Sequence, residues 1–144
     1  MLKTKRLNIR ELTFADINNV HELHSLPETN EFNTLGIPEN IQTTKNLLEE
    51  WIALQKQEPR SCYIFCIDKN DDNSFIGLIA LNLGKANYQN AEVWFKIHKN
   101  FWRKGYTTEA LTILLDLGFN NLKLHRIEAG WLLKTLLRVK FLKK

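Results

Sequence analysis

The sequence predicts a single α+β domain over residues 1–144, with a mixed, mostly antiparallel sheet and flanking helices. A chain of 144 residues with 44% hydrophobic and 25% charged residues can bury one core and leaves no room for a second domain. Several early segments alternate apolar and polar residues with the period of half-buried strands. A strand–helix–strand order follows, without any internal repeat. We therefore expect antiparallel strands first and a strand–helix–strand unit at the end.

The N-terminal part is predicted to begin with a strand and a helix. Residues 6–12 alternate in the manner of a half-buried strand. Thr13, with Asp16 three residues later, is typical of a helix start, and this helix should end before Pro27. Residues 28–42 contain a glycine and a proline, which indicate a mobile connection of the kind that faces substrates.

A second helix and three adjacent strands are predicted for the middle of the chain. Apolar residues at helical spacing favour a helix over 43–57, which Pro59 stops. Polar, turn-forming residues separate the strands that follow, so these strands should pair as antiparallel neighbours. In chain order, the strands are expected at 62–67, 75–83 and 91–97, a helix at 107–119 and a last strand at 124–129.

The net charge and the lengths of the apolar runs indicate which kinds of partner the protein binds. A formal charge of +4 and a pI near 9.1 favour anionic partners such as phosphates. A nucleic-acid-binding domain would rest on basic clusters alone, and no RNA-binding aromatic motif supports it. No apolar run approaches the roughly 20 residues that span a bilayer, and no signal segment begins the chain, so we expect a cytoplasmic protein without a membrane partner.

The sequence offers no complete metal site. Cys62 and Cys66 lie four residues apart in an extended segment, and neither a histidine nor a second cysteine pair accompanies them. His21 and His24 are three residues apart on a predicted surface helix, again without a third ligand. We expect two reduced thiols and no metal.

The segment from Ala91 to Ala110 is the most informative for chemistry. Here a predicted strand ends in a basic turn that opens a helix. The unpaired N–H groups and the positive end of the helix dipole, together with Arg103, Lys104 and the unhindered Gly105, favour a pyrophosphate. The pattern lacks the glycines of a Walker or a Rossmann loop. The simpler alternative is a basic, solvated turn.

Several segments together resemble one known family. They are Phe-Trp-Arg-Lys-Gly-Tyr-Thr-Thr-Glu-Ala-Leu at 101–111, Leu-His-Arg-Ile-Glu-Ala at 124–129, Thr-Lys-Arg-Leu at 4–7 with Arg10, Phe-Ile-Gly at 75–77 and Ala-Glu at 91–92. Over residues 4–130 the chain resembles the GNAT superfamily of N-acetyltransferases, most closely its ribosomal-protein-acetylating (RimJ/RimL-like) subgroup. The resemblance implies an α/β/α fold and direct transfer of an acetyl group from acetyl-coenzyme A to a primary amine, either a protein N-terminus or a small amine.

The resemblance also implies which residues hold acetyl-coenzyme A. Backbone groups near Phe95 would stabilise the thioester oxyanion, and those of Ile97 would contact pantetheine. The residues implied at the pyrophosphate are Trp102, Arg103, Lys104, Gly105, Tyr106, Thr107 and Thr108. Two of these depart from the superfamily's general pattern. Trp102 replaces its first Gln or Arg, as is usual in the subgroup, and Thr107 stands where the pattern has Gly or Ala.

Glu92 is the candidate general base. An acceptor amine is protonated at neutral pH and must lose a proton before it attacks a thioester. Glu92 lies on the strand that would contact pantetheine, where an acidic residue acts in the family, often through water. The alternative is an exposed strand carboxylate without a role. Covalent transfer through Cys62 or Cys66 is not expected, because neither has an evident base or cation beside it.

Residues 131–144 form an atypical tail that lacks the family's usual C-terminal helix and strand. Read one base earlier, codons for these residues permit the family's missing Asn-x-x-Ser and Glu-Lys motifs in register. We therefore hypothesise a frameshifted gene, which the nucleotide sequence beyond codon 130 tests. The alternative is a genuine basic, amphipathic tail.

The loss of the closing strand would have two consequences. It would expose a sheet edge, which a homodimer could cover. It also leaves open a second function, a degenerate and weakly active or inactive member that only binds coenzyme A.

Overall fold

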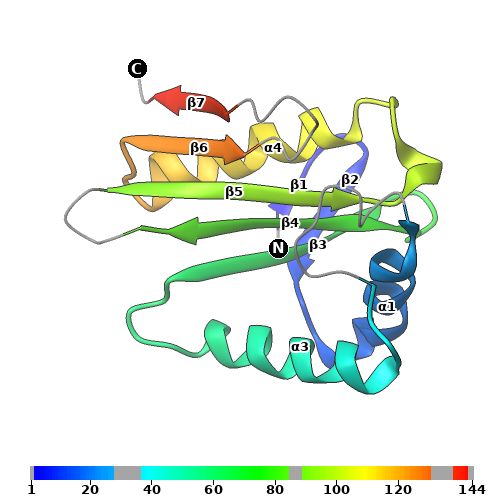
Figure 1. Cartoon of the computed structure of the whole chain (residues 1–144). Coiled ribbons are helices and arrows are strands. Elements are labelled where there is room, and N and C mark those ends of the chain that lie inside the picture. The colour runs from blue at the N-terminus through cyan, green and yellow to red at the C-terminus, as the bar shows by residue number, and fades with distance from the viewer. Residues whose placement is uncertain (1, 28–36, 85–88, 131–137, 143–144) are drawn as a thin grey trace.

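The computed structural model describes residues 2–27, 37–84, 89–130 and 138–142. Their strands form one seven-stranded sheet in the order β1-β2-β3-β4-β5-β6-β7 (Figure 1). The strand bounds are Leu2–Lys3 (β1), Leu7–Glu11 (β2), Cys62–Lys69 (β3), Phe75–Leu83 (β4), Asn90–Ile97 (β5), Arg126–Gly130 (β6) and Arg138–Leu142 (β7). All neighbours are antiparallel except β5 and β6, which are parallel. The predicted α+β class is confirmed, as is the antiparallel pairing of the three middle strands β3, β4 and β5.

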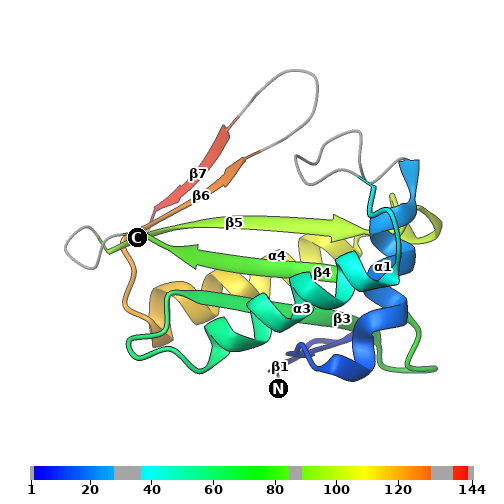
Figure 2. The same cartoon turned by 60° about the horizontal axis from the view of Figure 1, so that its bottom comes forward.

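The helices cover both faces of the sheet. Helices α1 (Ile17–Ser25) and α3 (Ile41–Gln55) lie on one face, and α4 (Tyr106–Asp116), which connects β5 to β6, lies on the other (Figures 1 and 2). A 3-10 turn at Phe14–Asp16 precedes α1, another at Lys99–Phe101 precedes α4, and a π-helical turn at Leu117–Asn121 follows α4. A parallel strand pair needs such a crossover, so the position of α4 follows from the strand order.

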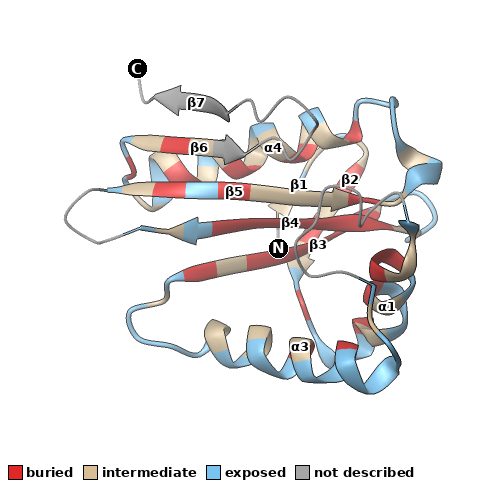
Figure 3. Cartoon of the chain, in the orientation of Figure 1, coloured by how far each residue is buried: buried red, intermediate tan, exposed pale blue. Residues whose placement is uncertain are grey.

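Alternation along the strands divides the core between these two faces. From β3, Phe65 and Ile67 pack on the α4 side with Leu114, whereas Cys66 packs with Val20 on the α1 side. The central strands β3 and β4 are the most continuously buried, as Figure 3 shows. Because helices cover both faces, these strands are apolar on both sides and do not alternate strictly.

The strands β5 and β6 separate part of the way along β5. Their parallel register runs from Asn90 opposite Arg126 to Val93 opposite Ala129. Beyond Val93, β5 stays paired with β4 as far as Ile97. The end of β6 and the whole of β7 turn away from β5 (Figure 2). The C-terminal half of β5 therefore borders an opening between two strands.

Local sequence signals account for the helix starts. Thr13 and Asp16 form the predicted capping box, with the Asp16 carboxylate accepting from the Thr13 N–H at 2.9 Å. Helix α3 begins at Ile41, two residues before the prediction, because the Asn40 side chain accepts from the Thr43 N–H and caps it. Most of the predicted connection at 28–42 lies outside the described residues.

The structure corrects one prediction for α1 and one for the tail. His24 is 2% exposed and belongs to the core, not to the surface. The strand β7 pairs with β6 at all five registered positions from Arg126 to Gly130, so the tail itself supplies a strand where an exposed edge was expected. That pairing removes the reason for a homodimer that covers β6. Residues 131–137 lie outside the described part of the chain, as do 143 and 144.

Candidate functional site

The predicted phosphate segment forms a tight turn between β5 and α4. Arg103 adopts a left-handed conformation with φ 61°, and Gly105 another with φ 81°. A side chain at Gly105 would be strained there, and its Cβ would lie 3.2 Å from Nη2 of Arg6. The two left-handed residues reverse the chain sharply, which is why the helix begins directly after Gly105.

The first turn of α4 presents unpaired donors to the turn. At the helix start, the Glu109 N–H donates to the Gly105 carbonyl at 3.1 Å. The N–H groups of Tyr106, Thr107 and Thr108 precede that bond and have no acceptor within the helix. Thr107 is half-buried and Thr108 exposed, whereas the Tyr106 ring is buried. An anion at this end would meet backbone donors and the positive end of the helix dipole.

A residue from the opposite end of the chain holds this turn. Nη1 of Arg6 donates to the Lys104 carbonyl at 3.0 Å, and Nε donates to Glu109 at 2.7 Å. The Arg6 guanidinium also lies over the Tyr106 ring, 4.5 Å from its centroid. This contact could not be predicted from the sequence, because no local period links residues that lie 103 positions apart.

The backbone of β5 completes the predicted cofactor edge. The His98 N–H donates to the Ile76 carbonyl at 2.8 Å, which sets the alternation of the β4–β5 ladder. By that alternation the backbone groups of Phe95 and Ile97 face the side of β6, beyond the point where the β5–β6 register ends. The predicted pantetheine contacts therefore lie on the opened stretch of β5.

The Trp102 side chain forms a hydrogen bond with the backbone at the end of β5. Its indole Nε1–H donates to the Ile97 carbonyl at 2.7 Å, while 42% of the residue remains exposed. The indole thus joins the end of β5 to the turn before α4. Of the two predicted backbone groups of Ile97, the carbonyl has a partner within the chain.

Glu92 lies near the last paired residues of β5, on the face that carries α1 and α3. Its side chain is exposed, and it lines a depression of about 280 Å³ with Asn82, Glu128 and Arg126. Glu92 stands opposite Asn82 in β4 and opposite Glu128 in β6. The carboxylate is therefore accessible and lies where the two parallel strands begin to separate.

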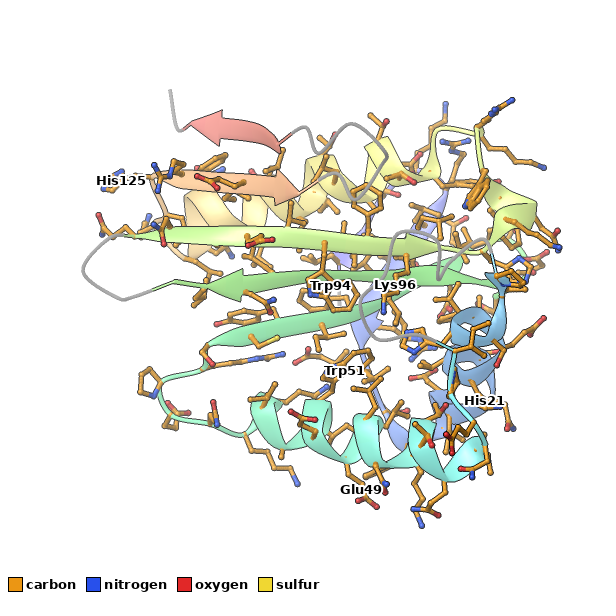
Figure 4. The ribbon with its side chains drawn as sticks, viewed as in Figure 1. His21, Glu49, Trp51, Trp94, Lys96 and His125 are labelled. Atoms are coloured by element: carbon orange, nitrogen blue, oxygen red, sulfur yellow. The ribbon has the colours of Figure 1, made fainter. Side chains whose placement is uncertain are left out.

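The same face of β5 carries Trp94 and Lys96, which the sequence analysis did not use as a pair. Trp94 packs on Trp51 of α3 with centroids 5.8 Å apart, and Nζ of Lys96 lies 3.2 Å from Nε2 of His24 (Figure 4). Burial lowers the pKa of Lys96 to about 8. Alternate residues of a strand lie on one face, so the sequence could have placed Glu92, Trp94 and Lys96 together. It does not show which helix residues pack against them.

The two cysteines are structural. Both are free and buried, and burial raises the pKa of each thiol. Cys62 donates to the side-chain oxygen of Asn82 at 2.9 Å. Among the described residues, no cluster of three or more His, Cys, Asp or Glu side chains could hold a metal ion, and no helix is long and apolar enough to cross a membrane.

Comparison with known proteins agrees with this geometry. Residues 6–133 match the family model of the acetyltransferase (GNAT) domain. The N-acetyltransferase YnaD of Bacillus subtilis is 30% identical over 130 residues, which cover 89% of this chain and 71% of that protein. A stretch of 101 residues is 34% identical to YjcK, also of Bacillus subtilis, and covers 69% of this chain and 54% of that protein.

Solved structures share the fold. A GNAT-family acetyltransferase from Bacillus anthracis superposes with a TM-score of 0.73 at 26% identity, covering 89% of this chain and 71% of that one. A spermidine N-acetyltransferase from Vibrio cholerae, solved with CoA and spermine, gives 0.73 at 21% identity over 88% of this chain and 71% of its own. The strand β5 parts from its parallel neighbour, and a helix with unpaired backbone donors begins beyond it. Because the family model also matches most of the chain, this protein belongs to the GNAT family of N-acetyltransferases.

Proposed function

We propose that the protein transfers an acetyl group from acetyl-coenzyme A directly to a primary amine. One observation carries the proposal: the opened stretch of β5 leads straight into the turn and helix start at 102–108. A long ligand with an amide-rich arm and a diphosphate fits this order. Its arm would pair with strand backbone and its diphosphate would meet helix donors.

Each predicted cofactor residue has a role in this proposal. The backbone of Phe95 and the N–H of Ile97 would meet the pantetheine arm, while the Trp102 indole fixes the Ile97 carbonyl. The residues from Arg103 to Thr108 would surround the diphosphate with basic side chains and backbone N–H groups. Gly105 fits this role because glycine adopts the left-handed conformation without strain, and because it has no side chain that would come close to Arg6.

Glu92 would accept the proton from the acceptor amine. Its exposure and its place where β5 and β6 begin to part support this role. An ammonium ion in the depression beside Glu92 would be attracted by the Glu92 carboxylate, whereas Glu128 lies 3.4 Å from Nε of Arg126 and is partly neutralised by it. Removal of its proton by Glu92, directly or through a water molecule, would leave a neutral amine that can attack the thioester carbon. Backbone N–H groups near Phe95 would stabilise the resulting oxyanion. Cleavage of the C–S bond would then release coenzyme A as a thiolate, which takes up the remaining proton of the attacking nitrogen as the amide forms.

The cysteines support direct transfer. A covalent acetyl-enzyme would need a thiolate at the site, and burial raises the pKa of both Cys62 and Cys66. Cys66 is 0% exposed and packs beneath α1, out of reach of a bound acceptor. Donor and acceptor would therefore be bound at the same time.

The acceptor would be a protein N-terminus or a small amine. The motifs at 4–7 and 101–111 resemble those of the ribosomal-protein-acetylating subgroup, which favours a protein N-terminus. A spermidine acetyltransferase with the same fold illustrates the small-amine class. We expect the loops around 28–42 and 84–89 to choose between them.

The test is release of free thiol from acetyl-coenzyme A in the presence of an amine panel, with peptides and polyamines. Glu92→Gln should lower the rate about a hundredfold and remove the acidic limb of the pH profile. The control Glu49→Gln, on the exposed side of α3 (Figure 4), should leave both unchanged. Coenzyme A binding without thiol release for any amine would instead favour a degenerate member. An unchanged Glu92→Gln profile would remove Glu92 as the base.

A further inference from the structure

Thr4 and Arg6, near the N-terminus, form hydrogen bonds with the first turn of α4. Glu109 accepts from three donors there: the Thr4 hydroxyl, the Arg6 backbone N–H at 2.9 Å and Arg6 Nε at 2.7 Å. The remaining side of the Arg6 guanidinium reaches the Lys104 carbonyl at 3.0 Å. One side chain thus ties the turn before α4 to the carboxylate of its first turn.

We propose that Arg6 is a positioning residue for the diphosphate of coenzyme A: it fixes the Lys104–Gly105 peptide and cancels the charge of Glu109. The inference rests on the proposed function, because it concerns the same anion site. It goes beyond that function by assigning the affinity of the site to a residue that does not itself belong to the turn or the helix.

Peptide geometry carries the first half of the proposal. A trans peptide is planar, so its N–H points away from its carbonyl. Because Arg6 holds the Lys104 carbonyl, the Gly105 N–H is directed to the opposite side, away from Arg6. The left-handed conformation of Arg103 is sparsely populated in a free chain, and Gly105 is free to adopt several conformations, so the Arg6 contact restrains the orientation of this peptide.

Electrostatics carries the second half. A carboxylate in the first turn is attracted by the positive end of the helix dipole. The same carboxylate repels an anionic ligand at that helix end. Burial opposes ionisation of Glu109, yet the hydrogen bonds from Thr4 and Arg6 outweigh it and lower the pKa of this carboxyl. Glu109 is therefore ionised at neutral pH, and the Arg6 cation in direct contact with it offsets its charge near the diphosphate.

A second arginine on the same stretch of chain provides a matched control. Arg10 binds Asp16 through 2.7 and 2.9 Å bonds and Asp68 through a 2.7 Å bond. None of these partners belongs to α4 or to the turn before it. A substitution at Arg10 removes a comparable ion-pair network and leaves the anion site intact.

The experiment measures the dissociation constant of coenzyme A by calorimetry, with the melting temperature of each unliganded variant recorded beside it. Arg6→Lys keeps the charge but cannot donate to both Glu109 and the Lys104 carbonyl, and should weaken binding about threefold. Arg6→Met also loses the charge and should weaken binding at least about tenfold. Glu109→Gln added to Arg6→Met should tighten binding again, because the uncancelled charge is gone. Arg10→Lys should lower the melting temperature and leave the dissociation constant unchanged.

Each outcome decides a separate point. Equal binding by wild type and Arg6→Met overturns the inference and leaves the proposed function standing. A double variant that binds no better than Arg6→Met refutes the charge-cancelling half. If Arg10→Lys weakens binding as much as Arg6→Lys at the same melting temperature, Arg6 acts only through stability and the inference is wrong. No binding by wild type at millimolar coenzyme A contradicts the proposed function, and the role of Arg6 with it.

Discussion

The ammonium nitrogen of Lys96 lies 3.2 Å from Nε2 of His24, so β5 and α1 meet through two groups that would repel each other if both were charged. Burial first, and then the charges of Lys96 and His21, lower the pKa of His24 to about 3. Burial lowers the pKa of Lys96 to about 8. At neutral pH, Lys96 therefore donates to a neutral imidazole.

Lys96→Met should raise the free energy of unfolding at neutral pH. The folded pKa of Lys96, about 8, lies below its usual 10.5, so the unfolded chain binds more protons between these values and wild-type stability should rise with pH across that window. The full window corresponds to an effect on the order of 3 kcal/mol. Urea unfolding at pH 7 and pH 10 measures it. Parallel pH profiles for wild type and the variant would contradict the lowered pKa.

Acid should destabilise the fold through His24. The folded pKa of about 3 lies below the usual 6.5, so the stability that a neutral imidazole provides is present above pH 6.5 and is lost as the pH falls toward 3. Between pH 6.5 and 4.5 the loss should be about 2 kcal/mol. His24→Gln should remove that part of the pH dependence, and substitution of the exposed His125 by Gln should not. A similar acid profile in all three proteins would argue against a buried neutral His24.

Gly77→Ala should destabilise the sheet beneath the site. A Cβ at Gly77 would overlap the backbone carbonyl oxygen of Lys96, which cannot move without breaking the β4–β5 ladder. The expected cost is about 2 kcal/mol or more. Gly84→Ala is the comparison, because its Cβ would first meet the Asn90 side chain, which can rotate away. Equal losses in chemical denaturation would show that the ladder yields as easily as a side chain.

Gly105→Asp should abolish stabilisation by coenzyme A. The substitution puts a side chain at φ 81°, close to Arg6 Nη2, and adds a negative charge where the diphosphate is proposed to bind. Asn73→Asp is the matched control, since Asn73 also has a positive φ, 59°, but lies between β3 and β4. Thermal shift with millimolar coenzyme A measures the effect. A shift that survives Gly105→Asp would place the diphosphate elsewhere.

Regular elements could be predicted from the sequence, and contacts between them could not. The helix α4 has a clear helical period, and polar, turn-forming residues bound the strands β3 to β5, so their predicted bounds differ from the structure by only a few residues. The two-residue strand β1 is too short to show a period, and it was missed. His24 was assigned to a surface because a helix period does not show which helix face the sheet covers.

The candidate site likewise has one part that the sequence predicts and other parts that depend on contacts between distant segments. The turn before α4 and the helix start could be predicted because their signals, a basic pair and a glycine before a helix, are adjacent in sequence. The anion site at this turn stays a prediction. The opening beside Phe95 could not be predicted, because it depends on where β6 leaves β5. The cation of Lys96 in a buried position depends on helices that approach from an earlier part of the chain. Tertiary packing, which no local pattern encodes, determined both.

The contact between Arg6 and Glu109 also bears on the order in which the protein folds. The hairpin of β3 and β4 needs only neighbouring residues, so it can form as soon as that part of the chain exists. The Arg6 contact closes a loop of 103 residues and requires β2 to have docked on β3 first. During synthesis, the turn before α4 therefore reaches its final shape only after most of the chain has emerged. A fragment that begins after β2 would carry the sequence of the proposed anion site without the Arg6 contact that shapes it.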